Sequence, residues 1–424
     1  MIKRKALWFF YTLLYIGCIL SFASCQGGNR SAASDEQGDT IPMKYARHLM
    51  MVKHDGYTEA IIANPWKEGV KLHRYVLIPK GKKGDETAEM LMKRRAGMSG
   101  NRKGAHVDIV RTPIESSVVF TSPHCQLLYE LGCSQTIKGV CDLAYINIPD
   151  VKRRAKVAKG SEGIVDCGSS MQPDVERIID LKPEALLISP FENSGGYGKL
   201  DKLKIPIIET ADYMETSPLG RAEWMKFYGL LFGKALGGNG VGDTKADSLF
   251  SKIEKENLSL KARAAKLPKG LSILTERKMG SVWYVPGGQS TIGILLKDAN
   301  AKYIFASDKH SGSLALSPEQ ILDKGKEVDV WAFKYFGGKP MTRPDLLKEY
   351  DGYKALLAFM TQDIYECNTS VVPYFEQTSF HPEVLLREFI LISHPKAQGF
   401  GKLRFYQPLM GNDGLELWGR TVEC

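Results

Sequence analysis

The chain has 424 residues, of which 43% are hydrophobic and 25% charged, and its formal net charge at pH 7 is +9. This length is enough for two or three domains with substantial cores. Part of the positive charge lies in the run from Lys80 to Lys103, which lacks interleaved aromatic residues, so a solvated loop and helix face explains it better than nucleic-acid binding.

Residues 1–24 are predicted to be a lipoprotein signal peptide. A basic start is followed by the apolar run from Ala6 to Leu20, which is shorter than the ~20 residues needed to span a bilayer. Phe22-Ala23-Ser24-Cys25 resembles the lipobox of bacterial lipoproteins, whose cysteine is lipidated and becomes the mature N-terminus. We therefore expect a lipid anchor on Cys25 and a flexible tether over residues 25–44, with a plain signal anchor as the alternative.

Residues 45–242 are predicted to form an α/β lobe that opens with a β-hairpin. The hairpin is indicated by two strand-like runs, 57–62 and 72–78, on either side of a turn at 64–69. Short apolar strands then alternate with helices, the strands at 118–120, 137–140, 185–188 and 205–209 and the helices at 125–131 and 173–181. This alternation predicts a mostly parallel sheet covered on both faces.

Residues 243–267 are predicted to form one long helix. Ala246, Leu249, Phe250, Ile253 and Asn257 recur at helical spacing, and Pro268 and Gly270 end the pattern. At about 1.5 Å per residue such a helix is roughly 36 Å long, the width of a small domain. We expect it to join two lobes, although an ordinary surface helix within one domain would show the same pattern.

Residues 268–424 are predicted to form a second α/β lobe and a tail. Strands are expected at 271–276, 281–285, 303–305 and 328–333, and helices at 291–299 and from Ser317-Pro318-Glu319-Gln320 onward. Four residues of the first lobe recur here at an offset of 143: Glu176, Ile178, Asp180 and Glu184 match Glu319, Ile321, Asp323 and Glu327. The matching order of elements predicts that the two lobes are a structural repeat.

Loops that follow parallel strands gather at the carboxyl edge of a sheet, where open α/β folds bind ligands. In this chain those loops are rich in aromatic rings, which suit a bulky planar or ring-bearing ligand. The residues predicted to bind it are His124, Asp142, Tyr145, Phe191, Glu192, Tyr213, Trp283, Tyr284, Trp331 and Phe333.

Signatures of catalysis or of resident metals are poor. The stretch 288–293 misses the spacing of a nucleophile elbow by one residue, and the glycines at 238–242 follow a helix rather than a strand. The eight histidines are scattered. We therefore predict no catalytic residues, no resident metal and no cofactor.

Six cysteines follow Cys25: Cys125, Cys133, Cys141, Cys167, Cys367 and Cys424. An exported protein could oxidise some of them, and six cysteines allow fifteen full pairings, between which the sequence does not choose. Because no CxxC motif is present, buried free thiols are the default interpretation.

The order of several motifs resembles the iron-siderophore and cobalamin periplasmic binding proteins of ABC importers. The resemblance covers roughly residues 112–395, whereas the hairpin before it and the tail after it depart from the usual pattern. The motifs that carry it are Ser122-Pro123 with the helix ending at Gly132, the run 173–184, Gly220-Arg221-Ala222-Glu223-Trp224, Tyr284-Val285-Pro286-Gly287-Gly288, and 316–320. It implies two lobes with mostly parallel sheets bridged by a single long helix.

The resemblance also implies a function. The protein would capture a metal chelate (a ferric siderophore, haem or cobalamin) between its lobes and deliver it to the permease dimer of an ABC importer, with Glu176 and Glu319 docking on permease arginines. It would be a non-enzymatic, lipid-anchored protein of the cell envelope facing the periplasm. The alternatives are an exported hydrolase or chelate-processing enzyme on the same scaffold, and a surface lipoprotein that serves an outer-membrane receptor.

Overall fold

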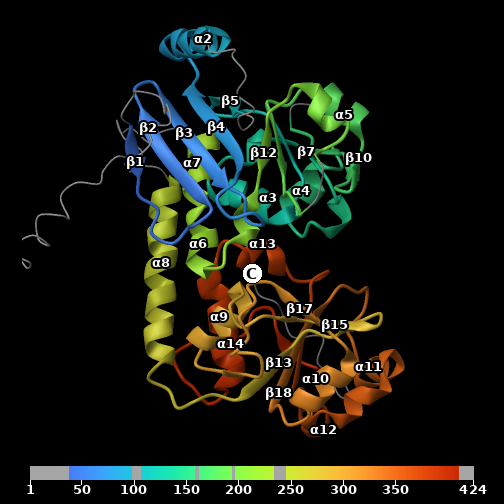
Figure 1. The fold of residues 1–424 in the computed structure, drawn as a ribbon. Helices are drawn as coiled ribbons and strands as arrows, with labels where there is room; N and C mark the ends of the chain where they lie inside the picture. The colour runs from blue at the N-terminus through green and yellow to red at the C-terminus, as the bar shows by residue number, and fades with distance from the viewer. Residues whose placement is uncertain (1–37, 98–106, 158–161, 193–195, 234–244, 410–424) are drawn as a thin grey trace, which may run out of the picture. The chain divides into compact units, whose positions relative to one another are not determined.

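The computed structural model describes residues 38–97, 107–157, 162–192, 196–233 and 245–409. They form an N-lobe and a C-lobe, each built on a mostly parallel sheet, which are joined by the long helix α8 (Figure 1). Both lobes belong to one compact unit that starts at Thr40. The predicted fold class, an α/β protein with two lobes and one bridging helix, is therefore confirmed. The predicted signal peptide and Cys25 lie outside the described residues.

The N-lobe is organised around a parallel sheet with the strand order β12-β11-β6-β7-β8. Its strands are β6 (Ser117–Val119), β7 (Ile137–Val140), β8 (Val165–Asp166), β11 (Ala185–Ile188) and β12 (Ile207–Glu209). The helices of this lobe are α3 (Ser122–Glu130), α4 (Pro149–Arg154), α5 (Val175–Leu181), α6 (Pro218–Glu223) and α7 (Met225–Phe232). Shorter elements are β9 (Gly168–Ser169), β10 (Gln172–Pro173) and the 3₁₀ helices η1 (Ser134–Thr136), η2 (Leu143–Tyr145), η3 (Leu200–Leu203) and η4 (Ala211–Met214).

A second sheet precedes the N-lobe sheet in the chain. Its elements are β1 (Asp39–Ile41), β2 (Leu49–His54), β3 (Tyr57–Ala63), β4 (Lys71–Pro79), α2 (Lys82–Gly97) and β5 (Val107–Thr112). Strands β3 and β4 form the predicted antiparallel hairpin, and β5 runs parallel to β4. The buried side chains of this sheet pack in the same hydrophobic core as those of the N-lobe sheet. A hydrogen bond from the Tyr75 hydroxyl to the Ile207 carbonyl, at 2.8 Å, also links the two sheets.

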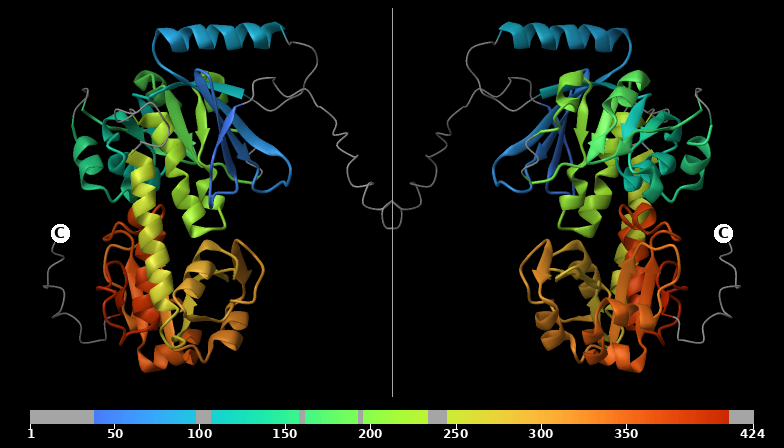
Figure 2. Two further views of the ribbon diagram at one scale, coloured as in Figure 1. Left: turned by 90° about the vertical axis from the view of Figure 1, so that its left-hand side faces the viewer. Right: turned by 90° about the vertical axis from the view of Figure 1, so that its right-hand side faces the viewer.

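One face of helix α8 (Lys245–Ala264) packs into the cores of both lobes. Ala246, Phe250 and Ile253 pack in the N-lobe core, and Leu260 and Ala264 pack in the C-lobe core. The helix contacts α7 in the N-lobe and α14 in the C-lobe, and both views of Figure 2 show it beside the two lobes. Because one rigid helix enters both cores, it joins the lobes as predicted. Residues 243 and 244 of the predicted helix lie outside the described residues.

The C-lobe sheet has the strand order β16-β13-β18-β19-β20, and only β20 runs antiparallel to its neighbour. Its strands are β13 (Ser272–Thr275), β16 (Lys302–Tyr303), β18 (Val330–Tyr335), β19 (Ile364–Asn368) and β20 (Gln407–Pro408). A separate antiparallel sheet consists of β14 (Lys278–Met279), β15 (Val282–Pro286) and β17 (Ser313–Leu316). The helices are α9 (Thr291–Asp298), α10 (Pro318–Gly325), α11 (Arg343–Glu349), η6 (Asp351–Ala355), α12 (Leu357–Thr361), α13 (Tyr374–Thr378) and α14 (Pro382–Ser393).

The strand orders confirm the structural repeat. Strand β8 lies beyond β7 and has no counterpart in the C-lobe. Among the other parallel strands of each lobe, the first lies inside the sheet, the second lies on one side of it, the third on the other side, and the fourth beyond the third. By this rule β6, β7, β11 and β12 correspond to β13, β16, β18 and β19. Helices α5 and α10 precede the third strand of their sheets, so Glu176 and Glu319 occupy equivalent places.

The segment after β19 crosses from the C-lobe back to the N-lobe. Helix α13 packs against α3, and Phe380, which is 1% exposed, lies in the N-lobe core. Its ring is 5.5 Å from that of His124 and 6.0 Å from that of Tyr228. The lobes are thus connected at a second place besides α8.

The five cysteines in the described part of the chain are free thiols, in line with the default interpretation, and Cys424 lies outside it. Burial raises the pKa of Cys367 to about 12. Within the described ranges, no helix combines the length and the apolar character needed to cross a membrane.

Candidate functional site at the carboxyl edges of the two sheets

Three of the predicted binding rings are exposed together at one edge of the N-lobe sheet. Tyr145 follows β7, Phe191 follows β11 and Tyr213 follows β12, and they are 61%, 52% and 37% exposed. Because these strands run parallel within one sheet, the loops after them emerge at the same edge. Exposed aromatic rings at this edge offer a large apolar surface to a ligand.

Hydrogen bonds hold the loops that carry these rings. Asp142 adopts a left-handed conformation with φ 53°, which is uncommon for a residue other than glycine. Its carboxylate accepts from the Ser170 amide at 3.2 Å, and its carbonyl accepts from the Tyr145 amide at 2.9 Å. The Tyr213 hydroxyl donates to the Pro190 carbonyl, which ties the loop of Tyr213 to that of Phe191. Partial burial raises the pKa of Tyr213.

The C-lobe contributes an aromatic ring that the sequence analysis missed. Phe336 lies directly after β18, is 53% exposed, and its ring centroid is 4.9 Å from that of Tyr145. Beside this pair, the side-chain amide of Asn147 donates to the Val371 carbonyl at 2.9 Å, and the backbone amide of Asn147 donates to the Glu376 carboxylate at 2.8 Å. The carboxyl edges of the two sheets therefore meet at Tyr145 and Phe336.

A charged contact also links the lobes. The imidazole of His381, just before α14, lies 2.8 Å from the Glu130 carboxylate of α3 and 2.8 Å from that of Glu383. Burial would lower the pKa of His381, but the bonds to the two carboxylates outweigh it and raise this pKa to about 10. His381 is therefore protonated at neutral pH and pairs with both lobes.

Two of the predicted binding rings, Trp331 and Phe333, belong to the core instead. Strand β18 extends to Tyr335, two residues beyond the predicted end at 333, so both rings lie within the strand and are fully buried. The Trp331 indole donates to the Glu276 carbonyl at 2.7 Å. A strand inside a parallel sheet is covered on both faces, which explains why neither ring reaches a ligand.

Trp283 is also a core residue, whereas Tyr284 is not. Both lie on β15, where successive side chains point to opposite faces. Trp283 is 0% exposed and packs against Trp331 and Tyr353, with ring centroids 5.8 Å and 5.4 Å away. Tyr284 is 46% exposed. The prediction that Trp283 faces the ligand is therefore wrong.

His124 is a buried structural residue rather than a ligand contact. It is 3% exposed, and its Nε2 lies 2.8 Å from the Asp212 carboxylate and 3.0 Å from the Tyr228 hydroxyl. Its Nδ1 contacts the hydroxyl of Thr121. Both ring nitrogens are thus used within the N-lobe core, and this prediction is wrong as well.

The predicted carboxylates are at the surface. Glu192 is exposed next to Phe191. Glu176 and Glu319 are exposed in the first turns of α5 and α10, whose N-cap side chains are Asp174 and Ser317. Hydrogen bonds from its own amide and from Ser317 lower the pKa of Glu319. Each equivalent helix thus presents one exposed carboxylate at its start.

Other features of the described ranges lie apart from this site. A cavity of about 560 Å³ opens beside Gln135 and Thr136, which precede β7 and so lie at the opposite edge of the N-lobe sheet. No cluster of three or more histidine, cysteine, aspartate or glutamate residues within those ranges is arranged to hold a metal ion.

Comparison with known proteins is consistent with this architecture. An uncharacterized lipoprotein of Methanocaldococcus jannaschii is 22% identical over 385 residues, which cover 88% of this chain and 86% of the relative. A second one from the same organism is 23% identical over 405 residues, covering 92% and 96%. A solved periplasmic heme-binding protein of Pseudomonas aeruginosa superposes with a TM-score of 0.50 at 15% identity, covering 70% of this chain and 97% of that one. Residues 118–371, more than half of the chain, match the periplasmic binding protein family, and the chain therefore belongs to it.

Proposed function

We propose that this protein binds a metal chelate (a ferric siderophore, haem or cobalamin) between its lobes and delivers it to an ABC importer without transforming it. Membership of the periplasmic binding protein family supports capture and delivery. The observation that carries the proposal is the Tyr145–Phe336 pair, in which half-exposed rings from the two lobes meet at the carboxyl edges of both sheets.

The chemistry of this edge suits a large ligand with apolar or planar parts. The exposed rings of Phe191 and Tyr213 add apolar surface on the N-lobe side, and the exposed side chain of Val371 adds apolar surface on the C-lobe side. Stacking contributes about 0.5–1.5 kcal/mol per aromatic pair beyond the burial of area. The exposed Glu192 offers a carboxylate beside Phe191 for polar groups of the ligand.

We expect Tyr145→Ala and Phe336→Ala each to weaken chelate binding by about tenfold, since each removes one ring from the ligand surface. Purified protein is titrated with haemin, a ferric hydroxamate siderophore and cyanocobalamin, and binding is followed by absorbance and tryptophan fluorescence. Met360→Ala is the matched control, because Met360 is equally exposed (59%) but lies in α12 at the opposite edge of the C-lobe sheet.

The same titration separates binding from catalysis. A binder gives saturable, stoichiometric capture and returns the chelate unchanged, whereas a hydrolase or chelate-processing enzyme releases a product. If neither ring substitution changes the affinity for a chelate that the parent protein binds, the ligand surface lies elsewhere.

We also propose that Cys25 carries the lipid anchor, which is supported by the lipobox-like sequence and by relatives named as lipoproteins. Several acyl chains together hold a protein to a membrane far more firmly than one. Cys25→Ser is therefore expected to move the protein from the membrane fraction to the soluble envelope fraction, as measured by immunoblot after sedimentation. An unchanged distribution would contradict lipidation at Cys25.

Glu176 and Glu319 are proposed to dock on the two-fold permease, one from each lobe. The lobes are structural repeats with one exposed carboxylate at each equivalent place, an arrangement that suits a partner with two-fold symmetry. Charges at an interface rim set encounter rate and register. The double variant Glu176→Lys, Glu319→Lys is therefore expected to bind the chelate normally but to fail in uptake by cells, with each single variant partly impaired.

Asp180→Lys with Asp323→Lys is the control for this experiment. These exposed residues lie later in the same two helices and are also separated by 143 positions. Because this pair also replaces two carboxylates by two lysines, its change in net charge equals that of the glutamate pair. Normal uptake is expected for this pair. Normal uptake in the glutamate double variant would leave Glu176 and Glu319 as ordinary helix-start residues. A surface lipoprotein that serves an outer-membrane receptor would show uptake defects that follow loss of the receptor rather than of the permease.

A further inference from the structure

The folded unit begins at β1, which lies next to β2 in the sheet, so the tether predicted over residues 25–44 ends earlier than expected. Two buried glutamates hold the segment that follows β1. The backbone amides of residues 44, 45 and 46 donate to the Glu223 carboxylate at 2.9, 2.7 and 2.9 Å. The amides of residues 47 and 48 donate to the Glu215 carboxylate, both at 2.9 Å. Burial would raise the pKa of Glu215, but the side chains of His48 and Trp224, together with these two backbone amides, lower it. Residues 44–48 are therefore tied firmly to the N-lobe.

The same segment lies on the bridging helix. The Lys44 ammonium and the Tyr45 hydroxyl reach the Glu254 carboxylate of α8 at 2.5 and 2.6 Å. The Tyr45 ring packs 6.1 Å from that of Phe250, one turn earlier on the helix. The segment that follows β1, on the side of the chain that leads back to Cys25, therefore packs against α8.

The outward face of α8 is basic. Of its acidic side chains, Glu254 pairs with Lys44, Glu256 pairs with Arg387, and Asp247 also has a partner. Lys252 and Lys255 are exposed, and the described residues include no ion-pair partner for either of them. The acidic charges of the helix are therefore largely neutralised while these two ammonium groups remain available.

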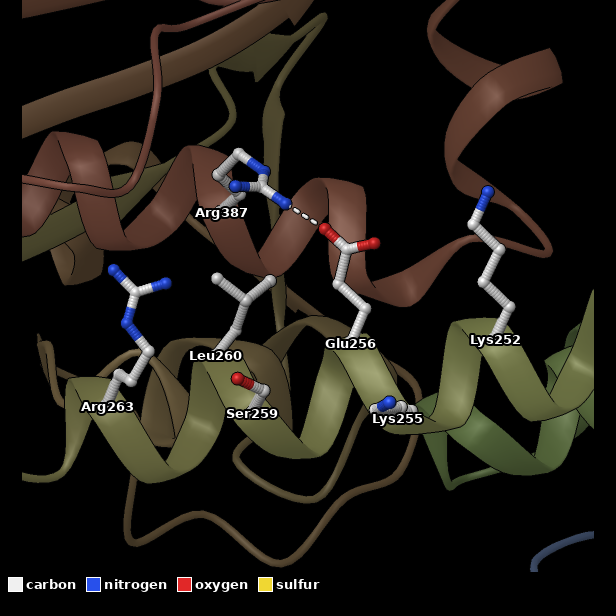
Figure 3. Close-up of a pocket in the computed structure, with 7 residues that line it drawn as sticks. All are labelled: Lys252, Lys255, Glu256, Ser259, Leu260, Arg263 and Arg387. Atoms are coloured by element: carbon white, nitrogen blue, oxygen red, sulfur yellow. Dashed lines mark hydrogen bonds and ion pairs between the residues drawn. The ribbon is translucent and has the colours of Figure 1, made fainter.

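A groove of about 320 Å³ runs along this face between α8 and α14, and four cationic side chains line it: Lys252, Lys255, Arg263 and Arg387 (Figure 3). The Arg263 guanidinium donates to the Gly399 carbonyl at 2.7 Å and lies 4.2 Å from the centre of the Phe400 ring. Arg387 donates to the Phe400 carbonyl at 3.1 Å. Hydrogen bonds to backbone carbonyls thus hold both arginine side chains, whereas Lys252 and Lys255 are exposed to solvent.

We propose that this basic face of α8, defined by Lys252, Lys255 and Arg263, docks on the anionic phospholipid headgroups of the membrane that carries the anchor. The inference rests on the proposed anchor at Cys25. Two features favour a membrane over another anionic partner: the basic face lies on α8, and the segment that follows the proposed anchor in the chain packs against the same helix through Lys44 and Tyr45. Basic residues are attracted to an anionic surface over about one Debye length, and a protein anchored at Cys25 stays close enough to the membrane to enter that range repeatedly.

Docking through α8 leaves the proposed permease contacts accessible. Figure 1 shows α5 and α10, which carry Glu176 and Glu319, away from α8. The docked protein is therefore held beside the membrane with these carboxylates free to meet the importer.

The test uses the native lipidated protein, purified from membranes and reconstituted into vesicles of phosphatidylcholine alone or mixed with phosphatidylglycerol. Exposed lysines are modified with a membrane-impermeant acylating reagent and quantified by mass spectrometry. We expect Lys252, Lys255 and the neighbouring Lys266 to be protected severalfold in the anionic vesicles only. The exposed Lys199 and Lys202 of η3 are expected to react equally in both. Protection is expected to vanish in 1 M NaCl, where the Debye length is about 3 Å.

A pair of variants separates charge from fold. In the double variant Lys252→Gln, Lys255→Gln we expect the protection of Lys266 to fall by fivefold or more. Each basic residue near an anionic surface changes the partition of the face between membrane and solution by about fivefold. The variant Lys199→Gln, Lys202→Gln removes two exposed lysines at the same spacing and is expected to keep Lys266 protected.

The outcomes distinguish the two proposals. Equal labelling of Lys252 and Lys255 in both kinds of vesicle would show an ordinary solvated helix face and overturn the docking surface. A purified protein that fails to float even with phosphatidylcholine vesicles would instead refute the anchor at Cys25.

Discussion

Replacing Trp283 by alanine is expected to lower the free energy of unfolding by about 3–5 kcal/mol, the usual cost of truncating a buried aromatic side chain. Trp283 is fully buried between Trp331 and Tyr353, and its indole donates to the Thr275 carbonyl at 3.3 Å. Truncation leaves a cavity among these rings and removes the hydrogen bond. The change is measured as a shift in the midpoint of urea unfolding with an unchanged slope.

The neighbouring residue provides the control for Trp283. Tyr284→Ala truncates another aromatic side chain on the same strand, but Tyr284 is 46% exposed, so we expect a change of at most about 1 kcal/mol. A Trp283→Ala variant as stable as the parent protein would show that this ring is not part of the core.

Replacing Asp212 by alanine is expected to destabilise the protein by about 3 kcal/mol. The carboxylate is fully buried and accepts hydrogen bonds from the Tyr228 hydroxyl at 2.8 Å and from Arg221 Nε at 3.1 Å, and it lies 2.8 Å from His124. Removing it leaves these polar groups without their shared partner. The estimate is at the lower end of the range for buried pairs because the Arg221 side chain is 22% exposed and gains water instead.

The pH dependence of the Asp212 contribution has a definite sign. Burial would raise the pKa of Asp212, but His124, Arg221 and the hydrogen bonds lower it below its ordinary value. Because the pKa of Asp212 is lower in the folded state, its ionised carboxylate stabilises the fold at pH values above the unfolded pKa of about 3.9. This contribution is lost as the pH falls through the pKa of Asp212 in the folded protein. The stability difference between the parent protein and Asp212→Asn should therefore shrink below about pH 4.

Urea unfolding of both proteins at pH 7 and pH 3 measures this difference. Asp323→Asn, at an exposed position of α10, is expected to leave stability nearly unchanged at both values. A constant difference between parent and Asp212→Asn across this range would contradict the proposed role of the carboxylate.

Periodicity was enough to predict the architecture from the sequence. The strands at 137–140 and 185–188 match β7 and β11 residue for residue, because short apolar runs between turn residues have few other interpretations. Helix α8 was predictable because its buried stripe has helical spacing along its whole length. The repeat was visible because the two copies kept identical residues at the starts of equivalent helices.

The binding surface was harder to predict because it depends on which face of a strand is covered. The pattern at Trp283-Tyr284 shows that one ring points inward but not which one. Phe336 was missed because strand β18 was ended two residues too early, at Phe333; Gly337-Gly338, a turn signal directly after Phe336, could have placed the end correctly. The burial of His124 could not be inferred, since its partners Asp212 and Tyr228 are distant in the sequence.

The position of Phe380 has a consequence for how the protein is made. The N-lobe core includes this ring, which lies far along the chain from the strands it packs with. A chain that is synthesised from its amino end delivers all strands of the N-lobe sheet well before Phe380. The N-lobe therefore completes its core only after β19 and α13 have emerged, and until then the rings of His124 and Tyr228 lack their cover. Folding of the two lobes is thus coupled during synthesis, and premature termination before α13 leaves the first lobe unfinished as well as the second.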